Sequence, residues 1–176
     1  MRFDAATVAA QPWKNGGGTT RELATLADAA GLLWRVSLAD IAKDGPFSAF
    51  PGLARSHTII EGQGLTLHGE SDVLEARPLR PLAFDGGLAL SARLVAGPCR
   101  ALNLIYDPAR LAAEAEVVVG AFTAEAGDVV FAIKGGMRLG GEVFASGQGM
   151  RLDGATPGET GGAVLVLRLR ERPAAR

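Results

Sequence analysis

The stretch Trp13-Lys14-Asn15-Gly16-Gly17-Gly18-Thr19-Thr20-Arg21-Glu22 decides our interpretation of this sequence. Its three consecutive glycines permit positive φ angles and close backbone approach but stabilise no regular element, and polar side chains flank them on both sides. A second dense patch follows, with the sequence Trp34-Arg35-Val36-Ser37-Leu38-Ala39-Asp40-Ile41 and then Gly45-Pro46-Phe47-Ser48-Ala49-Phe50-Pro51-Gly52-Leu53-Ala54-Arg55. We predict that these two patches form the two sides of one binding site.

The 176-residue chain has the rhythm of short strands and turns, because its 24 glycines and 9 prolines are spread throughout. In the segment 32–38, Arg35 and Ser37 alternate with apolar residues, so one face of that strand is polar and is a candidate pocket wall. We expect strands at Thr19–Leu26, Leu32–Leu38, Ala54–Glu61, Gly64–His68, Leu88–Val95, Arg100–Tyr106, Glu116–Phe122, Asp128–Ile133, Gly136–Leu139, Gly141–Phe144 and Ala163–Leu169.

One segment differs from this pattern. Residues 107–116 (DPARLAAEAE) are expected to form a connecting turn or short helix, with Asp107 as its cap and Pro108 in its first turn. This segment separates an N-terminal β-barrel half, residues 1–106, from residues 117–176, whose strands complete the second barrel half of a single compact unit.

The predicted fold class is all-β. A dozen short strands must protect their edges by closing a barrel or stacking two sheets, and we favour a pair of jelly rolls. A lipocalin-like barrel needs longer strands than these, and the cysteine and tryptophan spacing of an immunoglobulin-type sandwich is absent.

Several partners are disfavoured by composition. The formal net charge is −1, so no bulk positive field attracts a nucleic acid or an anionic membrane. The N-terminus lacks the apolar core of a signal peptide, and no window approaches the roughly 18 apolar residues of a membrane span. The single cysteine, Cys99, has no partner for an internal disulfide. We therefore expect a cytoplasmic protein that binds neither nucleic acid nor membrane.

Metal and nucleophile chemistry find little support in the sequence. Its two histidines, His57 and His68, have no His-x-His arrangement and no adjoining glutamate, so we predict no metal and no cofactor. There is no Gly-x-Ser-x-Gly motif, and the triglycine lacks the strand, helix and trailing lysine of a P-loop.

The remaining polar residues suit a small carboxylate anion. Arg35 and Arg55 offer planar forks that match a carboxylate, Lys14 offers a point charge, and the glycine amides around Gly17 can complete an anion nest. Neutral donors come from Asn15, Thr19, Thr20 and Ser48, and an apolar wall from Trp13, Trp34 and Phe47. Three alternatives stay open: a cross-strand ion pair of Arg35 with Glu22, tryptophans that belong to the core, and a plain turn at residues 47–52.

These motifs resemble the HutD/Ves family. The resemblance rests on the two patches together with Glu61-Gly62-Gln63-Gly64 and Leu102-Asn103, and it covers about residues 10–105. The second half is similar only in length and strand rhythm, and Ala101 stands where the family commonly has an acidic residue. The resemblance implies that the pocket residues are Trp13, Lys14, Asn15, Glu22, Arg35, Ser37, Phe47, Ser48, Arg55 and Asn103.

The resemblance also implies a metal-free, cupin-type bicupin that is often a homodimer, in a family of bacterial cytoplasmic proteins. One branch is linked to histidine utilisation, through binding of an intermediate such as formylglutamate or urocanate, and the other to cold or other stress. The favoured function is binding of such a carboxylate metabolite. The alternatives are a cupin-like enzyme with Glu22 as general base, and a stress-related interaction protein with a vestigial cavity.

Overall fold

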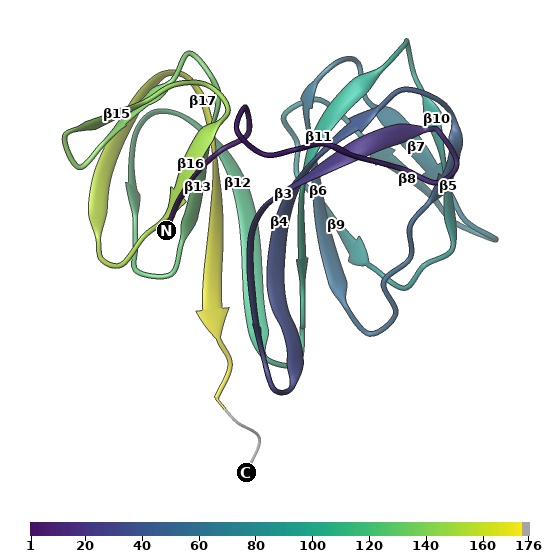
Figure 1. Cartoon of the computed structure of the whole chain (residues 1–176), viewed down its shortest axis with the longest axis horizontal. Coiled ribbons are helices and arrows are strands. Elements are labelled where there is room, and N and C mark those ends of the chain that lie inside the picture. The colour runs from purple at the N-terminus through teal and green to yellow at the C-terminus, as the bar shows by residue number, and fades with distance from the viewer. Residues whose placement is uncertain (174–176) are drawn as a thin grey trace. The chain divides into compact units, whose positions relative to one another are not determined.

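The computed structural model describes residues 1–173, and every regular element within them is a β-strand (Figure 1). The all-β prediction is confirmed. No helix of the described residues is long and apolar enough to cross a membrane. The chain divides into two compact units: the first unit is Val8–Pro108, and the second unit comprises Met1–Thr7 and the chain from Ala109 onward. The end of the predicted second half, residues 174–176, lies outside the described residues.

The first unit contains two antiparallel sheets (Figure 1). The strands of its six-stranded sheet follow the order β2 (Gln11–Pro12), β3 (Gly18–Asp28), β4 (Gly31–Ile41), β11 (Cys99–Tyr106), β6 (Ala54–Glu61) and β9 (Leu82–Asp85). Those of its four-stranded sheet follow the order β5 (Gly45–Phe47), β10 (Leu90–Leu94), β7 (Leu65–His68) and β8 (Val73–Ala76).

One hydrophobic core joins these two sheets. Because side chains alternate along a strand, each sheet turns every second residue toward this core. The cluster combines residues of the six-stranded sheet with residues of the four-stranded sheet, among them Ala39, Ile41, Ile59, Ala101, Leu65, Leu67, Leu90 and Ala92. The inward face of the six-stranded sheet is therefore the face that carries Ala39 and Ile41.

The second unit is built on a single sheet. Its strands follow the order β1 (Arg2–Asp4), β16 (Gln148–Arg151), β13 (Val129–Lys134), β17 (Thr156–Glu171), β14 (Met137–Leu139) and β15 (Glu142–Phe144), and β12 (Leu111–Ala124) also pairs with β17. Where the β12–β17 register shifts, Gly120 adopts a φ of 83°, a left-handed conformation that favours glycine. Its core cluster is Ala124, Val130, Ala132, Met137, Leu139, Phe144, Leu152, Val164 and Val166.

The segment 107–116, expected to be a connecting turn or short helix, contains no helix. Residues 107–110 form only a turn, and β12 begins at Leu111. Alanine and glutamate favour helices, but here Ala113 and Ala115 are half-buried while Glu114 and Glu116 are exposed, which is the two-residue period of a strand. Pairing of this segment with β17 along nearly its whole length outweighs its local preference.

The division of the chain also differs from the sequence-based expectation at the N-terminus. The first seven residues, assigned by sequence to the first half, belong to the second unit because β1 pairs with β16. Strands β1, β2, β5, β8, β9 and β16 were not expected, and each has four residues or fewer. Such short strands carry few alternating residues, and β7, β14 and β15, which are equally short, were expected because glycines adjoin them.

Candidate functional site

Polar residues of the first unit occupy one end of the inward face of its six-stranded sheet. Ser37 of β4 pairs with Glu22 of β3 and with Asn103 of β11, which in turn pairs with His57 of β6. Two residues further along, Arg35, Ile105, Arg55 and Phe84 form the neighbouring row across β4, β11, β6 and β9. Both rows share the face of the apolar core, because alternate residues of a strand point to the same side. We call Glu22, Arg35, Ser37, Arg55, His57 and Asn103 the inner polar cluster.

Asn103 is the centre of this cluster. Its side-chain Oδ1 accepts hydrogen bonds from Nε of Arg55 at 3.0 Å and from Nη2 of Arg55 at 2.7 Å. The same oxygen lies 2.6 Å from Nδ1 of His57. Asn103 is 2% exposed, so this network is closed off from bulk solvent.

Arg55 is a buried cation held by neutral groups. Its guanidinium also donates through Nη1 to the backbone oxygen of Ser48 at 3.3 Å and lies 4.0 Å from the ring centre of Phe47. The rings of Phe50 and Phe84 are each 5.8 Å from its Cζ. Burial, followed by the nearby charge of Arg35, lowers the pKa of Arg55 to about 9. Within residues 1–173, no carboxylate forms an ion pair with Arg55.

Arg35 places a second guanidinium beside the same aromatic wall. Its Cζ lies 5.2 Å from the ring centre of Phe50, which Arg55 also approaches. Its Nη1 is 3.8 Å from Oε2 of Glu22, a long ion pair whose carboxylate side chain is 51% exposed. The expected ion pair of Arg35 with Glu22 therefore exists, but its distance and exposure make it weak. The buried Nε of Arg35 has no hydrogen-bond partner among the described residues.

His57 completes the cluster and was not among the predicted site residues. It is fully buried, and its ring meets that of Phe47 edge to face with the centres 5.3 Å apart. Burial and the charge of Arg55 lower the pKa of His57 to about 3, against the opposing effect of its contact with Asn103. Its Nε2 is buried without a hydrogen-bond partner among the described residues. The spacing of Arg55 and His57 could have revealed it, because strand residues two apart share a face.

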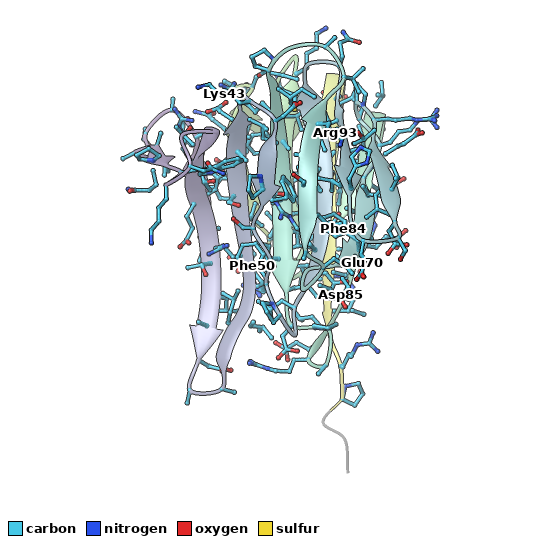
Figure 2. All side chains as sticks on the ribbon, turned by 90° about the vertical axis from the view of Figure 1, so that its right-hand side faces the viewer. Lys43, Phe50, Glu70, Phe84, Asp85 and Arg93 are labelled. Atoms are coloured by element: carbon cyan, nitrogen blue, oxygen red, sulfur yellow. The ribbon has the colours of Figure 1, made fainter. Side chains whose placement is uncertain are left out.

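The glycine-rich loop does not reach the inner polar cluster. Gly18 pairs with Ile41, six positions along β4 from Arg35, which corresponds to about 20 Å of extended strand. The oxygen of Gly17 accepts from the backbone nitrogen of Lys43 at 3.3 Å. Figure 2 places Lys43 near one end of the strands, and Phe50 with Asp85 toward the other end. The glycine-rich loop does not therefore meet Arg35 and Arg55, whereas Glu22, at the end of the first patch, lies beside Arg35.

Within the loop, the predicted contact groups satisfy one another or face solvent. The amide of Gly17 donates to Oδ1 of Asn15 at 2.9 Å, so it is not free to line an anion nest, and Lys14 is exposed. Nε1 of Trp13 donates to the hydroxyl of Thr20 at 2.8 Å while its ring packs on the core. Gly18 is required here, because a Cβ would come within 2.2 Å of the oxygen of Asp40.

Two further predicted residues lie on the opposite face of the sheet. Thr19 pairs with Asp40, and its hydroxyl donates to that carboxylate at 3.4 Å. Trp34 alternates with Arg35 along β4 and is 1% exposed, so it belongs to the buried side of the sheet that turns away from the cluster. The predicted residues that the structure brings together are Glu22, Arg35, Ser37, Phe47, Ser48, Arg55 and Asn103.

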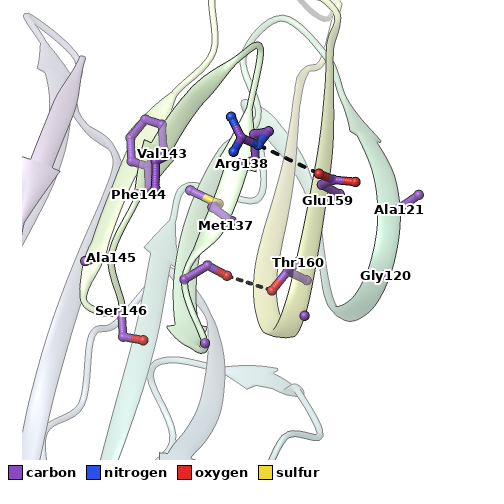
Figure 3. Close-up of a pocket in the computed structure, with 13 residues that line it drawn as sticks. Gly120, Ala121, Met137, Arg138, Val143, Phe144, Ala145, Ser146, Glu159 and Thr160 are labelled. Atoms are coloured by element: carbon purple, nitrogen blue, oxygen red, sulfur yellow. Dashed lines mark hydrogen bonds and ion pairs between the residues drawn. The ribbon is translucent and has the colours of Figure 1, made fainter.

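Each unit has a hollow large enough for a small ligand. In the first unit, a hollow of about 610 Å³ is lined by Gly52, Leu53, Ala54, Arg55, Ala83, Phe84, Asp85, Tyr106 and Pro108. Ala54, Ala83, Asp85 and Tyr106 alternate with residues of the cluster face, so these four side chains point to the opposite face of the sheet from Arg55. In the second unit, a hollow of about 730 Å³ lies between β14, β15 and β17 (Figure 3). There the one cation, Arg138, is 3.8 Å from Glu159, and none of the predicted site residues lines it. The chemistry expected from the sequence therefore belongs to the first unit.

Metal-binding groups are not clustered in the part of the chain that the structure describes. No three His, Cys, Asp or Glu side chains of residues 1–173 are grouped so that they could hold a metal ion. His57 contacts Asn103, and Nε2 of His68 lies 2.9 Å from the hydroxyl of Thr66. The guanidinium of Arg55, which lies beside His57, would also oppose the approach of a cation.

Comparison with known proteins gives consistent matches. A model of the HutD family matches residues 5–160. An uncharacterised 21.2 kDa protein in the hutC 3′ region of Pseudomonas putida is 40% identical over 107 residues, which make up 56% of this chain and 54% of that protein. The chain thus spans about half the length of this curated relative.

Solved structures extend the similarity over the whole chain. HutD from Pseudomonas fluorescens SBW25 (formate condition) is similar with a TM-score of 0.88 and 33% identity, over 98% of this chain and 99% of that one. A conserved protein of unknown function from Pseudomonas aeruginosa PAO1 gives a TM-score of 0.81 and 28% identity, over 96% and 97% of the two chains. Bacterial pirin YhhW from Escherichia coli, at 9% identity, a TM-score of 0.70 and 99% coverage of each chain, shares the fold alone, which is cupin-like.

Proposed function

The chain belongs to the HutD family, and from this premise we propose that it binds a small carboxylate in its first unit, with Arg55 and Arg35 as the cationic contacts. The observation that carries the proposal is the state of Arg55. Arg55 is only 6% exposed. Its guanidinium nevertheless has neutral oxygens and aromatic rings as partners, and no carboxylate among the described residues.

A buried charge without a counter-charge is costly. Buried ions in proteins are normally paired, because removal from water costs several kcal/mol per ion. Aromatic rings offset only about 0.5–2 kcal/mol of this cost per contact. The lowered pKa of Arg55 has the same origin, and a bound anion would relieve it.

The surroundings of Arg55 suit a carboxylate. A guanidinium presents two parallel N–H donors that match the two oxygens of a carboxylate. Arg35 adds a second positive charge, and the rings of Phe47, Phe50 and Phe84 supply an apolar wall of the kind that small-molecule sites have. This combination supports a small organic acid with an apolar portion.

The position of the relative's gene supports a narrower class of ligand. The Pseudomonas putida protein is described by its place in the hutC 3′ region, so we propose a carboxylate of histidine utilisation, of the formylglutamate or urocanate type. We also propose one cupin-type barrel in each unit and a site without a metal. A homodimer and a cytoplasmic location remain predictions from the sequence.

The enzyme alternative receives no support from the geometry. Glu22, its proposed general base, has a side chain that is 51% exposed and lies at the edge of the cluster beside Arg35. A general base is most effective when its pKa lies near the working pH, and a carboxylate usually needs burial to raise its pKa that far. We therefore favour binding without turnover.

Thermal unfolding in the presence of carboxylates tests the proposal. Formate, acetate, glutamate, N-formylglutamate and urocanate would each be compared with chloride at equal ionic strength. A ligand present at 100 times its Kd should raise the free energy of unfolding by about 2.7 kcal/mol. Arg55→Met should abolish the rise, whereas Arg138→Met, which removes an arginine from the second unit, should leave it intact. If none of these anions stabilises the wild-type protein more than chloride does, the proposal fails.

A further inference from the structure

We infer that His57 determines which carboxylate the inner polar cluster binds, by accepting a hydrogen bond through Nε2 from an N–H or O–H group of the bound ligand. This inference rests on the proposed function and narrows its ligand class. The ligand would be an organic acid with a hydrogen-bond donor a few bonds from its carboxylate, such as a hydroxy acid or an N-acylated amino acid.

The hydrogen bonds of Asn103 fix the orientation of its amide. Two N–H groups of Arg55 point at one terminal atom of that amide, at 3.0 Å and 2.7 Å, so this atom must be the oxygen. Exchanging the oxygen and nitrogen of the amide would set the NH2 group against two donors. Arg55 thereby decides which atom of Asn103 faces His57.

The orientation of Asn103 in turn fixes the tautomer of His57. Nδ1 of His57 lies 2.6 Å from Oδ1 of Asn103, and an amide oxygen can only accept, so Nδ1 carries the proton. The imidazole is neutral because it is fully buried beside the charge of Arg55. A neutral imidazole with its proton on Nδ1 has a lone pair on Nε2, which makes Nε2 an obligatory acceptor.

That acceptor is unsatisfied. Nε2 is buried and has no donor among the described residues, whereas buried polar atoms in proteins nearly always have a partner. His57 and Arg55 stand two residues apart on β6 and share the inward face. Both side chains contact Oδ1 of Asn103, so the guanidinium of Arg55 and the ring of His57 lie next to each other. The inner polar cluster therefore offers a cation for a carboxylate and an acceptor for a neighbouring donor.

Matched pairs of ligands test this inference. Glycolate would be compared with methoxyacetate, and N-acetylglycine with N-acetyl-N-methylglycine, since each second member keeps the carboxylate but lacks the donor. Calorimetric titration of the wild-type protein should show at least about tenfold tighter binding of the donor-bearing member in a pair. In His57→Phe, which retains an aromatic ring but no acceptor, this preference should disappear while the carboxylate itself still binds.

A second readout uses the wild-type protein and does not depend on how the variant folds. The ¹⁵N chemical shift of Nε2 of His57 should identify an unprotonated nitrogen, and it should move on addition of glycolate but not of methoxyacetate. Carboxylate binding without any preference within the pairs, as expected if a buried water satisfies Nε2, would overturn the role of His57 and leave the proposed function standing. Absence of binding for every carboxylate would overturn both.

Discussion

The two units differ in whether a buried charge has an oppositely charged partner. In the second unit the buried carboxylate of Asp128 is neutralised by Arg168 at 3.4 Å and by Arg170 at 2.6 Å. In the first unit the cation of Arg55 is nearly as buried but receives only neutral partners. A β-sheet core of this kind does not need polar groups inside, and a charge kept for structure is paired. The unpaired charge of Arg55 therefore indicates a function outside folding.

The largest effect is expected from breaking the paired charge. Asp128→Asn removes a carboxylate that accepts from Arg170 at 2.6 Å, from Arg168 at 3.4 Å and from the amide of Glu125 at 2.8 Å. Loss of charged hydrogen bonds at a buried position should lower the free energy of unfolding by about 3 kcal/mol. Chemical denaturation measures this loss of stability. Glu142→Gln is the control, since the ion pair of Glu142 with Arg2 is exposed. An equal effect of both substitutions would contradict the assigned role of Asp128.

A smaller effect is expected from the acid sensitivity of the first unit. Above pH 6.5 His57 is neutral in both the folded and the unfolded chain, so its contribution is constant. Below pH 6.5 the unfolded chain takes up a proton that the folded chain does not bind until the pH approaches 3, because the folded pKa of His57 is lowered to about 3. Stability is therefore lost as the pH falls, by about 1.4 kcal/mol per pH unit, or about 2 kcal/mol between pH 6.5 and 5.

Denaturation curves at several pH values measure this dependence. His57→Phe should reduce the loss between pH 6.5 and 5 by about 2 kcal/mol. His68→Phe is the matched control, because His68 is only half-buried and lies on the four-stranded sheet. The same pH profile in wild type and His57→Phe would show that His57 is not held neutral in the folded protein.

The smallest effect is expected from Arg55 itself. Arg55→Met removes an uncompensated buried charge and leaves a shorter apolar chain beside Phe47, Phe50 and Phe84. Without ligand, the free energy of unfolding should change by less than about 1 kcal/mol or increase. Equilibrium denaturation of the ligand-free variant measures this change. A loss of several kcal/mol would mean that Arg55 is a structural ion, comparable to Asp128, and the contrast between the two units would disappear.

The sequence predicted the strands more reliably than it predicted the contacts between them. Glycine and proline spacing located the longer strands, and alternation along residues 32–38 placed Arg35 and Ser37 on a polar face. The segment 107–116 was misassigned because local helix propensity cannot report pairing with a strand that begins at Thr156.

Only part of the site was predicted, again because the sequence does not report how strands pair. Arg55 and Asn103, 48 residues apart in sequence, belong to one set of motifs and are joined by hydrogen bonds. The triglycine loop belongs to the same motifs, but its position at the other end of β4 depends on strand register, which motif spacing does not contain. His57 was assigned no role because strand spacing places it on the face of Arg55 but does not show that Asn103 lies opposite it.

The most direct test of the account is a crystal structure of the protein grown with formate as the only added carboxylate. We predict an anion whose oxygens lie about 2.7–2.9 Å from the guanidinium of Arg55, on the side facing Arg35 and Phe50. Arg55 with Asn103, Ser48 and the aromatic rings as its sole partners at saturating formate would contradict the central claim, that this buried charge is kept for a carboxylate ligand.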